Sequence, residues 1–123
     1  IKFLRDPTRG GLASVLNEIA GLNQLTYELH ETALPVDAQV AGACEMLGLD
    51  PLYIANEGIF VAVVAKDITE SFVDELRADE NGLHAAVIGE VTTTQPGKVI
   101  LRSAIGGKRM VSYLQGEQLP RIC

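Results

Sequence analysis

Three stretches of the chain repeat apolar residues every three or four positions, which predicts amphipathic helices. Their apolar faces would consist of Leu12, Val15, Leu16 and Ile19 in the first stretch, Val40, Cys44 and Leu47 in the second, and Ile68, Phe72 and Leu76 in the third. Gly21 and Asn23 suit the end of the first helix. Pro35 and Asp37 indicate the start of the second helix, and Gly48 its end. Asp67 and Glu70 have the spacing of a capping box, which predicts the start of the third helix there.

Other stretches have the patterns of strands. Apolar and polar residues alternate in "LTYELHE", which predicts a half-buried strand, while the continuous apolar run "GIFVAVVA" predicts a central strand covered on both faces. "HAAVIGEVTTT" and "KVILRS" form two further strands, joined through the turn Gln95-Pro96-Gly97, and "KRMVSYL" is a candidate last strand. We therefore expect an α+β domain over residues 1–114, with a mixed or antiparallel sheet and packed helices, followed by a flexible tail over residues 115–123.

Composition narrows the function classes. The chain has 123 residues and a net charge of −6, which argues against nucleic-acid binding because that requires a basic face. No apolar run approaches the roughly 20 residues of a membrane span. Two cysteines without metal or disulfide spacing favour a reducing, cytoplasmic setting. Because the chain begins at Ile1, inside a loop-like motif, we expect it to be part of a longer protein.

The first candidate for chemistry is the loop "DPTRGG", which leads into the first predicted helix. Gly10 and Gly11 allow the backbone to approach a ligand closely, and a helix N-terminus attracts anions. Thr8 and Arg9 add donors suited to phosphate, and Asp6 could orient Arg9 or face a metal ion. The alternative is a plain helix entry capped by Asp6 or Thr8. The spacing is not that of the known nucleotide-binding fingerprints, so it leaves both interpretations open.

The second candidate is "ANEGIF", in which Asn56 and Glu57 precede the continuous apolar run. A carboxylate that enters a buried strand requires a partner or a proton, which suits a general acid or base. Glu57 could equally be a turn residue that caps a neighbouring backbone group.

The third candidate is the chain terminus, "EQLPRIC". Cys123 carries a thiol on an arm without periodicity, and such a thiol could enter one site and then leave for another. The alternative is an inert terminal cysteine.

The remaining polar and sulfur-containing residues suggest structural roles. Cys44 lies on the apolar face of the second helix and is expected to fill the core. His30 and His84 have no second ligand at metal spacing. A solvated face is expected for Glu28, Glu31 and Asp37.

Taken together, "RDPTRGGLA", "ALPV", "CEMLGLDPLYIANEG", "IGEV" and the terminal "PRIC" resemble the HypE family of hydrogenase-maturation proteins, in the family's order. The resemblance covers essentially the whole chain and matches the C-terminal domain. It implies the fold of the C-terminal domain of aminoimidazole ribonucleotide synthetase. It also implies an absent N-terminal domain that supplies most contacts to ATP and Mg²⁺.

The resemblance implies an activity and a role for each candidate residue. Cys123 matches the thiol that accepts a carbamoyl group, which is dehydrated with ATP to a thiocyanate, the source of the cyanide on the iron of nickel–iron hydrogenase. Glu57 matches the carboxylate proposed to take a proton. The positions that match the nucleotide side are Asp6, Thr8, Arg9, Gly10, Gly11 and Asn56.

The same resemblance implies partners: a HypF-type carbamoyltransferase that loads the thiol, a HypC–HypD iron scaffold that receives the cyanide, and a second copy in a homodimer. It implies neither nucleic acid nor membrane, and the chain alone is expected to be inactive. Two alternatives remain: a related ATP-dependent synthetase domain acting on a free substrate, and a non-catalytic docking module that presents Cys123.

Overall fold

The computed structural model describes residues 3–7, 10–53 and 59–112 of the chain. Its helices and strands are β1 (Phe3–Arg5), α1 (Gly11–Asn23), β2 (Thr26–His30), α2 (Ala38–Leu47), β3 (Val61–Val63), α3 (Thr69–Arg77), β4 (Gly89–Thr92), β5 (Val99–Arg102) and β6 (Lys108–Val111). Single 3₁₀ turns occur at η1 (Glu31–Ala33), η2 (Pro51–Tyr53), η3 (Lys66–Ile68) and η4 (Glu80–Gly82).

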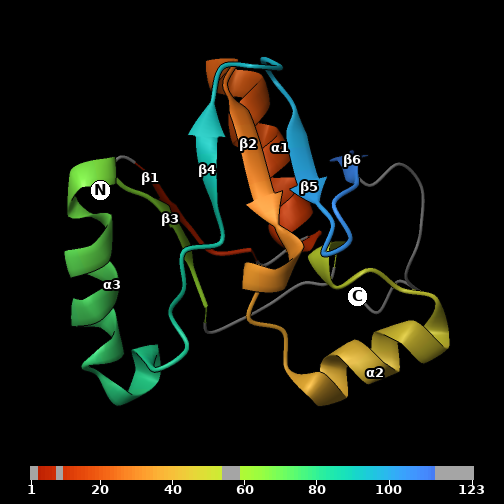
Figure 1. The fold of residues 1–123 in the computed structure, drawn as a ribbon, viewed down its shortest axis with the longest axis horizontal. Coiled ribbons are helices and arrows are strands. Elements are labelled where there is room, and N and C mark those ends of the chain that lie inside the picture. Colours follow the sequence, from red (N-terminus) through yellow and green to blue (C-terminus); the bar gives the residue numbers. More distant parts are fainter. Residues whose placement is uncertain (1–2, 8–9, 54–58, 113–123) are drawn as a thin grey trace.

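Four of the strands form a mixed sheet in the order β4-β2-β5-β6 (Figure 1). β2 is antiparallel to β4 and parallel to β5, and β6 is antiparallel to β5. β1 and β3 form a separate antiparallel pair. This arrangement confirms the predicted α+β class with a mixed sheet. The sequence did not show that β2 lies between β4 and β5, which are neighbours along the chain.

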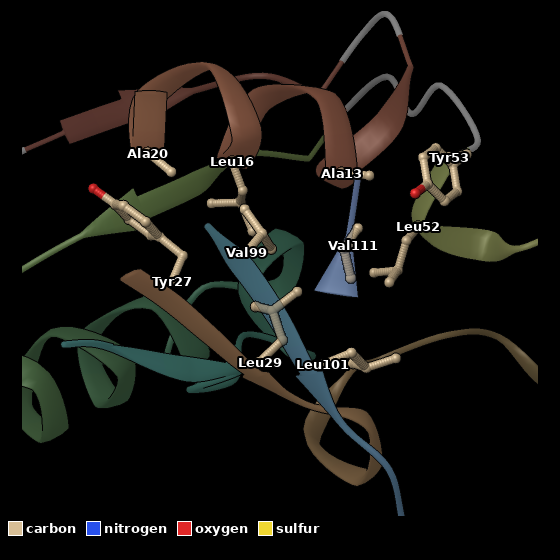
Figure 2. Packing of buried hydrophobic residues seen from close by; sticks show 10 residues of the cluster. All are labelled: Ala13, Leu16, Ala20, Tyr27, Leu29, Leu52, Tyr53, Val99, Leu101 and Val111. Carbon is tan, nitrogen blue, oxygen red and sulfur yellow. The ribbon is translucent and has the colours of Figure 1, made fainter. Parts of the chain in front are cut away.

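The core lies between α1 and one face of the four-stranded sheet (Figure 2). On α1 the most buried positions are Ala13, Leu16 and Ala20, whereas Leu12 and Ile19 of the predicted apolar face are only partly buried. The face is therefore rotated from the prediction. Small alanine side chains let a helix approach a sheet closely, and such positions carry little weight in a hydrophobic pattern.

One of the two inner strands of the sheet, β2, is more buried than its sequence pattern predicted. β2 was expected to be half-buried, but both of its faces are covered: Thr26 and Glu28 are buried, as are Tyr27 and Leu29. The assignment of Glu28 to a solvated face is therefore wrong, because this strand has neighbours on both sides and Arg102 of β5 pairs with the carboxylate. Glu31 and Asp37 are exposed, as predicted.

The continuous apolar run at residues 58–65 was predicted to be a central strand, and this prediction is wrong. Within the described part of the chain, β3 is three residues long, is only partly buried and pairs with β1. Ile59 and Phe60, which precede it, are about half exposed. An apolar run indicates an extended segment, but it does not determine how many strands lie beside it.

The second helix begins and ends where the sequence predicted. Asp37 caps α2 by accepting a hydrogen bond from the Gln39 amide (2.8 Å), and Gly48 ends it with φ of 70°. Cys44 is buried, which confirms its role in the core. Val40 and Leu47 share its predicted face but remain largely exposed.

The start of the third helix was predicted wrongly. Asp67 lies inside the 3₁₀ turn η3, and α3 begins at Thr69, whose hydroxyl donates to the Ala65 carbonyl (3.0 Å). The expected capping box is therefore not formed. Phe72 and Leu76 lie on one face of α3, but no residue of this helix is fully buried. None of the helices in the described ranges is long and apolar enough to cross a membrane.

Candidate functional site

The glycine loop leads into α1 through two residues in the left-handed region. Gly10 and Gly11 both have φ of 66°, a conformation that glycine adopts most readily. A Cβ on Gly10 would also lie 2.7 Å from the Cβ of Ser14, which is too close for a side chain. Gly10 is the N-cap residue of α1 and brings no side chain of its own to the first turn. This part of the loop therefore presents helix amides that suit an anion.

The entrance to this loop is held by its second residue, Pro7. Pro7 is fully buried, while its neighbour Asp6 is exposed. A buried proline with restricted φ gives the chain a rigid entry, and the Asp6 carboxylate is left accessible to a cation or to an arginine. Thr8 and Arg9, between these positions, lie outside the described residues.

The other sequence-predicted site residues also lie outside the described ranges. These are Asn56 and Glu57 in the segment 54–58 and Cys123 in the segment 113–123. Their roles stay predictions. The structure does place the residues to which these segments are bonded: Tyr53 and Ile59 flank the first, and Ser112 precedes the second.

Two of these flanking residues, Tyr53 and Ser112, meet near the start of α1. The Tyr53 hydroxyl donates to the Ser112 carbonyl (2.7 Å), so the residue before segment 54–58 contacts the residue before the tail. Tyr53 also belongs to the core cluster with Ala13 of α1, and Figure 2 shows the two close together. The helix that begins at Gly11, the segment that holds Glu57 and the tail that ends at Cys123 therefore depart from one region.

The β1–β3 pair brings two of the same segments together from the other side. Arg5 at the end of β1 is opposite Val61 at the start of β3. Asp6 follows Arg5, and Ile59 lies two residues before the start of β3. In an antiparallel pair these two positions lie at the same end. The loop of residues 6–11 and the segment 54–58 therefore adjoin one end of this strand pair.

Two residues near this junction were missed by sequence reasoning. Buried Asn17 uses its side-chain amide to donate to the carbonyls of Ala13 (2.8 Å) and Val111 (2.9 Å). Tyr53 lies in an apolar-rich segment, and its sequence pattern did not indicate a hydrogen-bonding role. A signal existed for Asn17, because it lies four residues after Ala13 and next to Leu16, where a polar residue on an apolar face requires a partner.

One buried charge lies away from this junction, on the sheet face opposite α1. Arg102 donates a hydrogen bond to Glu28 and holds the pKa of that carboxyl below its ordinary value, against the opposing effect of burial. Lys108 and His30 favour the charged form in the same direction. A carboxylate held charged by an arginine is suited to a structural role rather than to proton transfer.

Among the described residues, no group of three or more His, Cys, Asp or Glu side chains could hold a metal ion by itself. What these residues offer is the start of a helix, whose free amides suit an anion, and the exposed Asp6 carboxylate. Both fit the triphosphate and magnesium of a nucleotide, provided that further ligands come from elsewhere.

A family model describes most of the chain. Residues 1–102 match the family "AIR synthase related protein, C-terminal domain".

Curated relatives match over the full chain. It is 50% identical over 123 residues to the carbamoyl dehydratase HypE of Bradyrhizobium diazoefficiens and 48% identical to that of Azotobacter vinelandii. All of this chain is covered in each case, but only 36% of the relative. The chain thus spans about a third of the length of these relatives.

Solved structures of HypE proteins have the same fold as this chain. The Escherichia coli HypE crystal structure superposes with a TM-score of 0.91 at 42% identity, covering all of this chain and 38% of that one. A HypE structure in complex with ATP gives a TM-score of 0.88 at 48% identity, covering 98% of this chain and 37% of that one. A HypE–HypF complex gives 0.88 at 40% identity, covering 93% and 37%.

These similarities confirm the resemblance to HypE proteins that the motifs indicated. The match to the family model over residues 1–102 leads to one conclusion: this chain belongs to the family of C-terminal domains of AIR synthase related proteins.

Proposed function

We propose that this chain is the C-terminal domain of a HypE-type carbamoyl dehydratase and that Cys123 carries the reacting group. One observation supports this most strongly: the glycine loop, the segment that holds Glu57 and the tail that ends at Cys123 all depart from the same region beside the start of α1. A nucleotide, a carboxylate and a tethered thiol must meet for this chemistry. Relatives that carry the name carbamoyl dehydratase match this chain over its full length.

The proposed reaction removes water from a carboxamide bonded to the Cys123 sulfur. The amide oxygen is a poor leaving group, so it first takes the terminal phosphoryl group of ATP, which leaves ADP. Loss of phosphate and of the nitrogen protons then gives S–C≡N. Glu57 is the base for one of these protons. The balance is one carboxamide and one ATP converted to one thiocyanate, ADP, phosphate and a proton.

The nucleotide contacts of this chain would come from the loop and from Asn56. Gly10 and Gly11 allow close approach of backbone amides to phosphate oxygens, and Thr8 and Arg9 add a hydroxyl and a guanidinium. Asp6 would face Mg²⁺ or orient Arg9. The rest of the nucleotide site would belong to the part of the relatives that this chain does not span. We therefore expect the chain alone to bind ATP poorly and to be inactive.

The tethered thiol also accounts for the proposed partners. A tethered thiol can receive the carbamoyl group in a HypF-type carbamoyltransferase, return to the nucleotide, and deliver cyanide to iron on a HypC–HypD scaffold. The structure of a HypE–HypF complex supports the first of these partners. We further propose a cytoplasmic homodimer for the full-length protein.

The test follows the terminal peptide by mass spectrometry after a full-length protein containing this chain is incubated with HypF, carbamoyl phosphate and ATP. We expect the carbamoyl and then the cyano modification on Cys123. Glu57→Gln should retain the first and block the second, because it keeps the shape and loses the base. Cys123→Ala should load nothing, whereas Cys44→Ala, the matched control, should load normally. A cyano group formed at the normal rate in Glu57→Gln would contradict the role of Glu57.

A further inference from the structure

The end of β6 is held by two side chains that are far from it in the sequence. Asn17 of α1 donates to the Val111 carbonyl (2.9 Å), and Tyr53 of η2 donates to the Ser112 carbonyl (2.7 Å). Val111 and Ser112 are consecutive, and segment 113–123, which contains the tail, follows directly. Both donors lie on side chains that are at least nine-tenths buried.

Without these bonds this end of the sheet would be weakly held. β6 is a four-residue strand at the edge of the sheet and is paired with β5. Short edge strands and chain ends open readily. Val111 is almost fully buried against the core, and the two side-chain bonds hold the carbonyls of two consecutive residues, Val111 and Ser112. The chain is thereby fixed to α1 and η2 at its last described residue.

We propose that Asn17 and Tyr53 are positioning residues that set the point from which the Cys123 tail departs, relative to the loop before α1 and to the segment that holds Glu57. This inference rests on the proposed function. Cys123 is the eleventh residue after Ser112, so the thiol can lie at most about 40 Å from Ser112. Asn17 belongs to the helix that begins at Gly11, and Tyr53 immediately precedes segment 54–58. A fixed origin therefore favours return of the thiol to its own site.

Two buried tyrosines provide a matched pair of variants. Tyr53→Phe removes the hydroxyl that holds Ser112. Tyr27→Phe removes a hydroxyl that accepts from Asn23 (2.8 Å), near the other end of α1. Figure 2 shows Tyr53 beside Ala13 and Tyr27 beside Ala20. Each variant loses one hydroxyl from the same core, but only Tyr53→Phe removes a hydrogen bond to Ser112, the last described residue before the tail.

The experiment is a single turnover of the carbamoylated full-length protein at varied ATP concentration. We expect Tyr53→Phe to lower the maximal rate of cyano formation about fivefold, the factor that one net hydrogen bond contributes to the populated state. The ATP concentration at half-maximal rate and the loading by HypF should not change. Tyr27→Phe should change none of the three. Equal rates in both variants, or a change in the ATP dependence of Tyr53→Phe, would overturn the inference.

A second readout does not require activity. Hydrogen exchange in the peptide that spans residues 108–114 should become faster in Tyr53→Phe than in Tyr27→Phe. If the unsubstituted protein forms no cyano group, the proposed function fails. The exchange measurement still decides whether Tyr53 holds the end of β6 in place. An unchanged exchange rate of residues 108–114 in Tyr53→Phe would show that Tyr53 does not hold the end of β6.

A second pair of variants guards against misfolding of Tyr53→Phe. Asn17→Ala removes the bond to Val111, while Asn23→Ala removes an amide from the same helix that bonds Tyr27 and the Leu25 amide instead. Asn17→Ala should reproduce the slower turnover and the faster exchange, and Asn23→Ala should not. If both variants behave alike, Asn17 acts only through the stability of the fold and the inference fails.

Discussion

α1 and α3 are both amphipathic, but only α1 is embedded in the protein. No residue of α3 is fully buried, whereas α1 buries Ala13, Val15, Leu16 and Ala20. α3 has the sharper separation of apolar from charged residues of the two. The difference comes from the sheet that lies beside each helix. α1 packs on the four-stranded sheet, whereas α3 lies beside the two-stranded β1–β3 pair (Figure 1). Amphipathicity thus shows that a helix has an apolar face and leaves open how much surface covers it.

The regions around the two helices also differ in their proposed roles. The α1 region supplies the rigid frame from which the candidate segments depart, because Gly11, Asn17 and Tyr53 all belong to it or contact it. The region around α3, which includes the residues before β3 and before α3, exposes Ile59, Phe60 and Ile68. Four predictions test this difference, from the largest expected effect to the smallest.

Leu16→Ala should cause the largest loss of stability. Its side chain is 2% exposed and belongs to the core between α1 and the sheet. Removing it leaves a cavity that rigid neighbours fill poorly, so the free energy of unfolding should fall by about 3 kcal/mol. Urea denaturation followed by circular dichroism measures the change. A loss below about 1 kcal/mol would mean that the α1 region is no better packed than the α3 region.

Glu28→Gln should change how stability depends on pH. The folded-state pKa of Glu28 lies below its ordinary value of 4.5, chiefly through the bond from Arg102. The ion pair therefore stabilises the fold fully above this value, and the contribution is lost as the pH falls through the folded-state pKa. The unsubstituted chain should lose more stability below about pH 4.5 than Glu28→Gln does.

The matched control for this prediction is Glu31→Gln, since Glu31 is exposed one residue beyond the end of β2. Thermal melts at closely spaced pH values give the comparison. Parallel curves for the chain and Glu28→Gln would show that the buried pair has no effect on acid stability.

Leu76→Ala should cost clearly less than Leu16→Ala. Leu76 of α3 is partly buried and lines a shallow hollow together with Phe60 and Phe72. Truncation there removes less buried surface and leaves space that water can enter, so a loss of about 1 kcal/mol is expected. The same urea experiment provides the value. Equal losses for the two leucines would remove the distinction between the helices.

Arg5→Gln should have the smallest effect. Arg5 of β1 pairs with Glu18 of α1 at 3.3 Å, which connects the two regions, but both side chains are 46% exposed. Exposed ion pairs contribute little, so the change should stay within about 0.5 kcal/mol and should fade with added salt. A loss above 1 kcal/mol would indicate that the regions are energetically coupled through this pair.

Much of the secondary structure could be predicted because it depends on local chemistry. Asp37 and Gly48 bound α2 as expected, since a capping carboxylate and a left-handed glycine act within one turn. The capping box at Asp67 and Glu70 failed, because the preceding residues form a 3₁₀ turn that moves the start of α3 to Thr69. Of the candidate site, Asp6, Gly10 and Gly11 are described, and the left-handed glycines agree with the prediction of a tight loop before a helix.

The motifs in the sequence determined the family by themselves, because the loop, "NEG" and the terminal cysteine are recognised by residue type and order. Tertiary structure alone decided which residues meet. β2 lies between strands that are distant in sequence, so Glu28 is buried and bonded to Arg102, 74 residues away. Asn17 reaches Val111 across 94 residues, and Tyr53 reaches Ser112 across 59. Periodicity describes one segment at a time, whereas burial and hydrogen bonding depend on the segment opposite, which only the folded chain specifies.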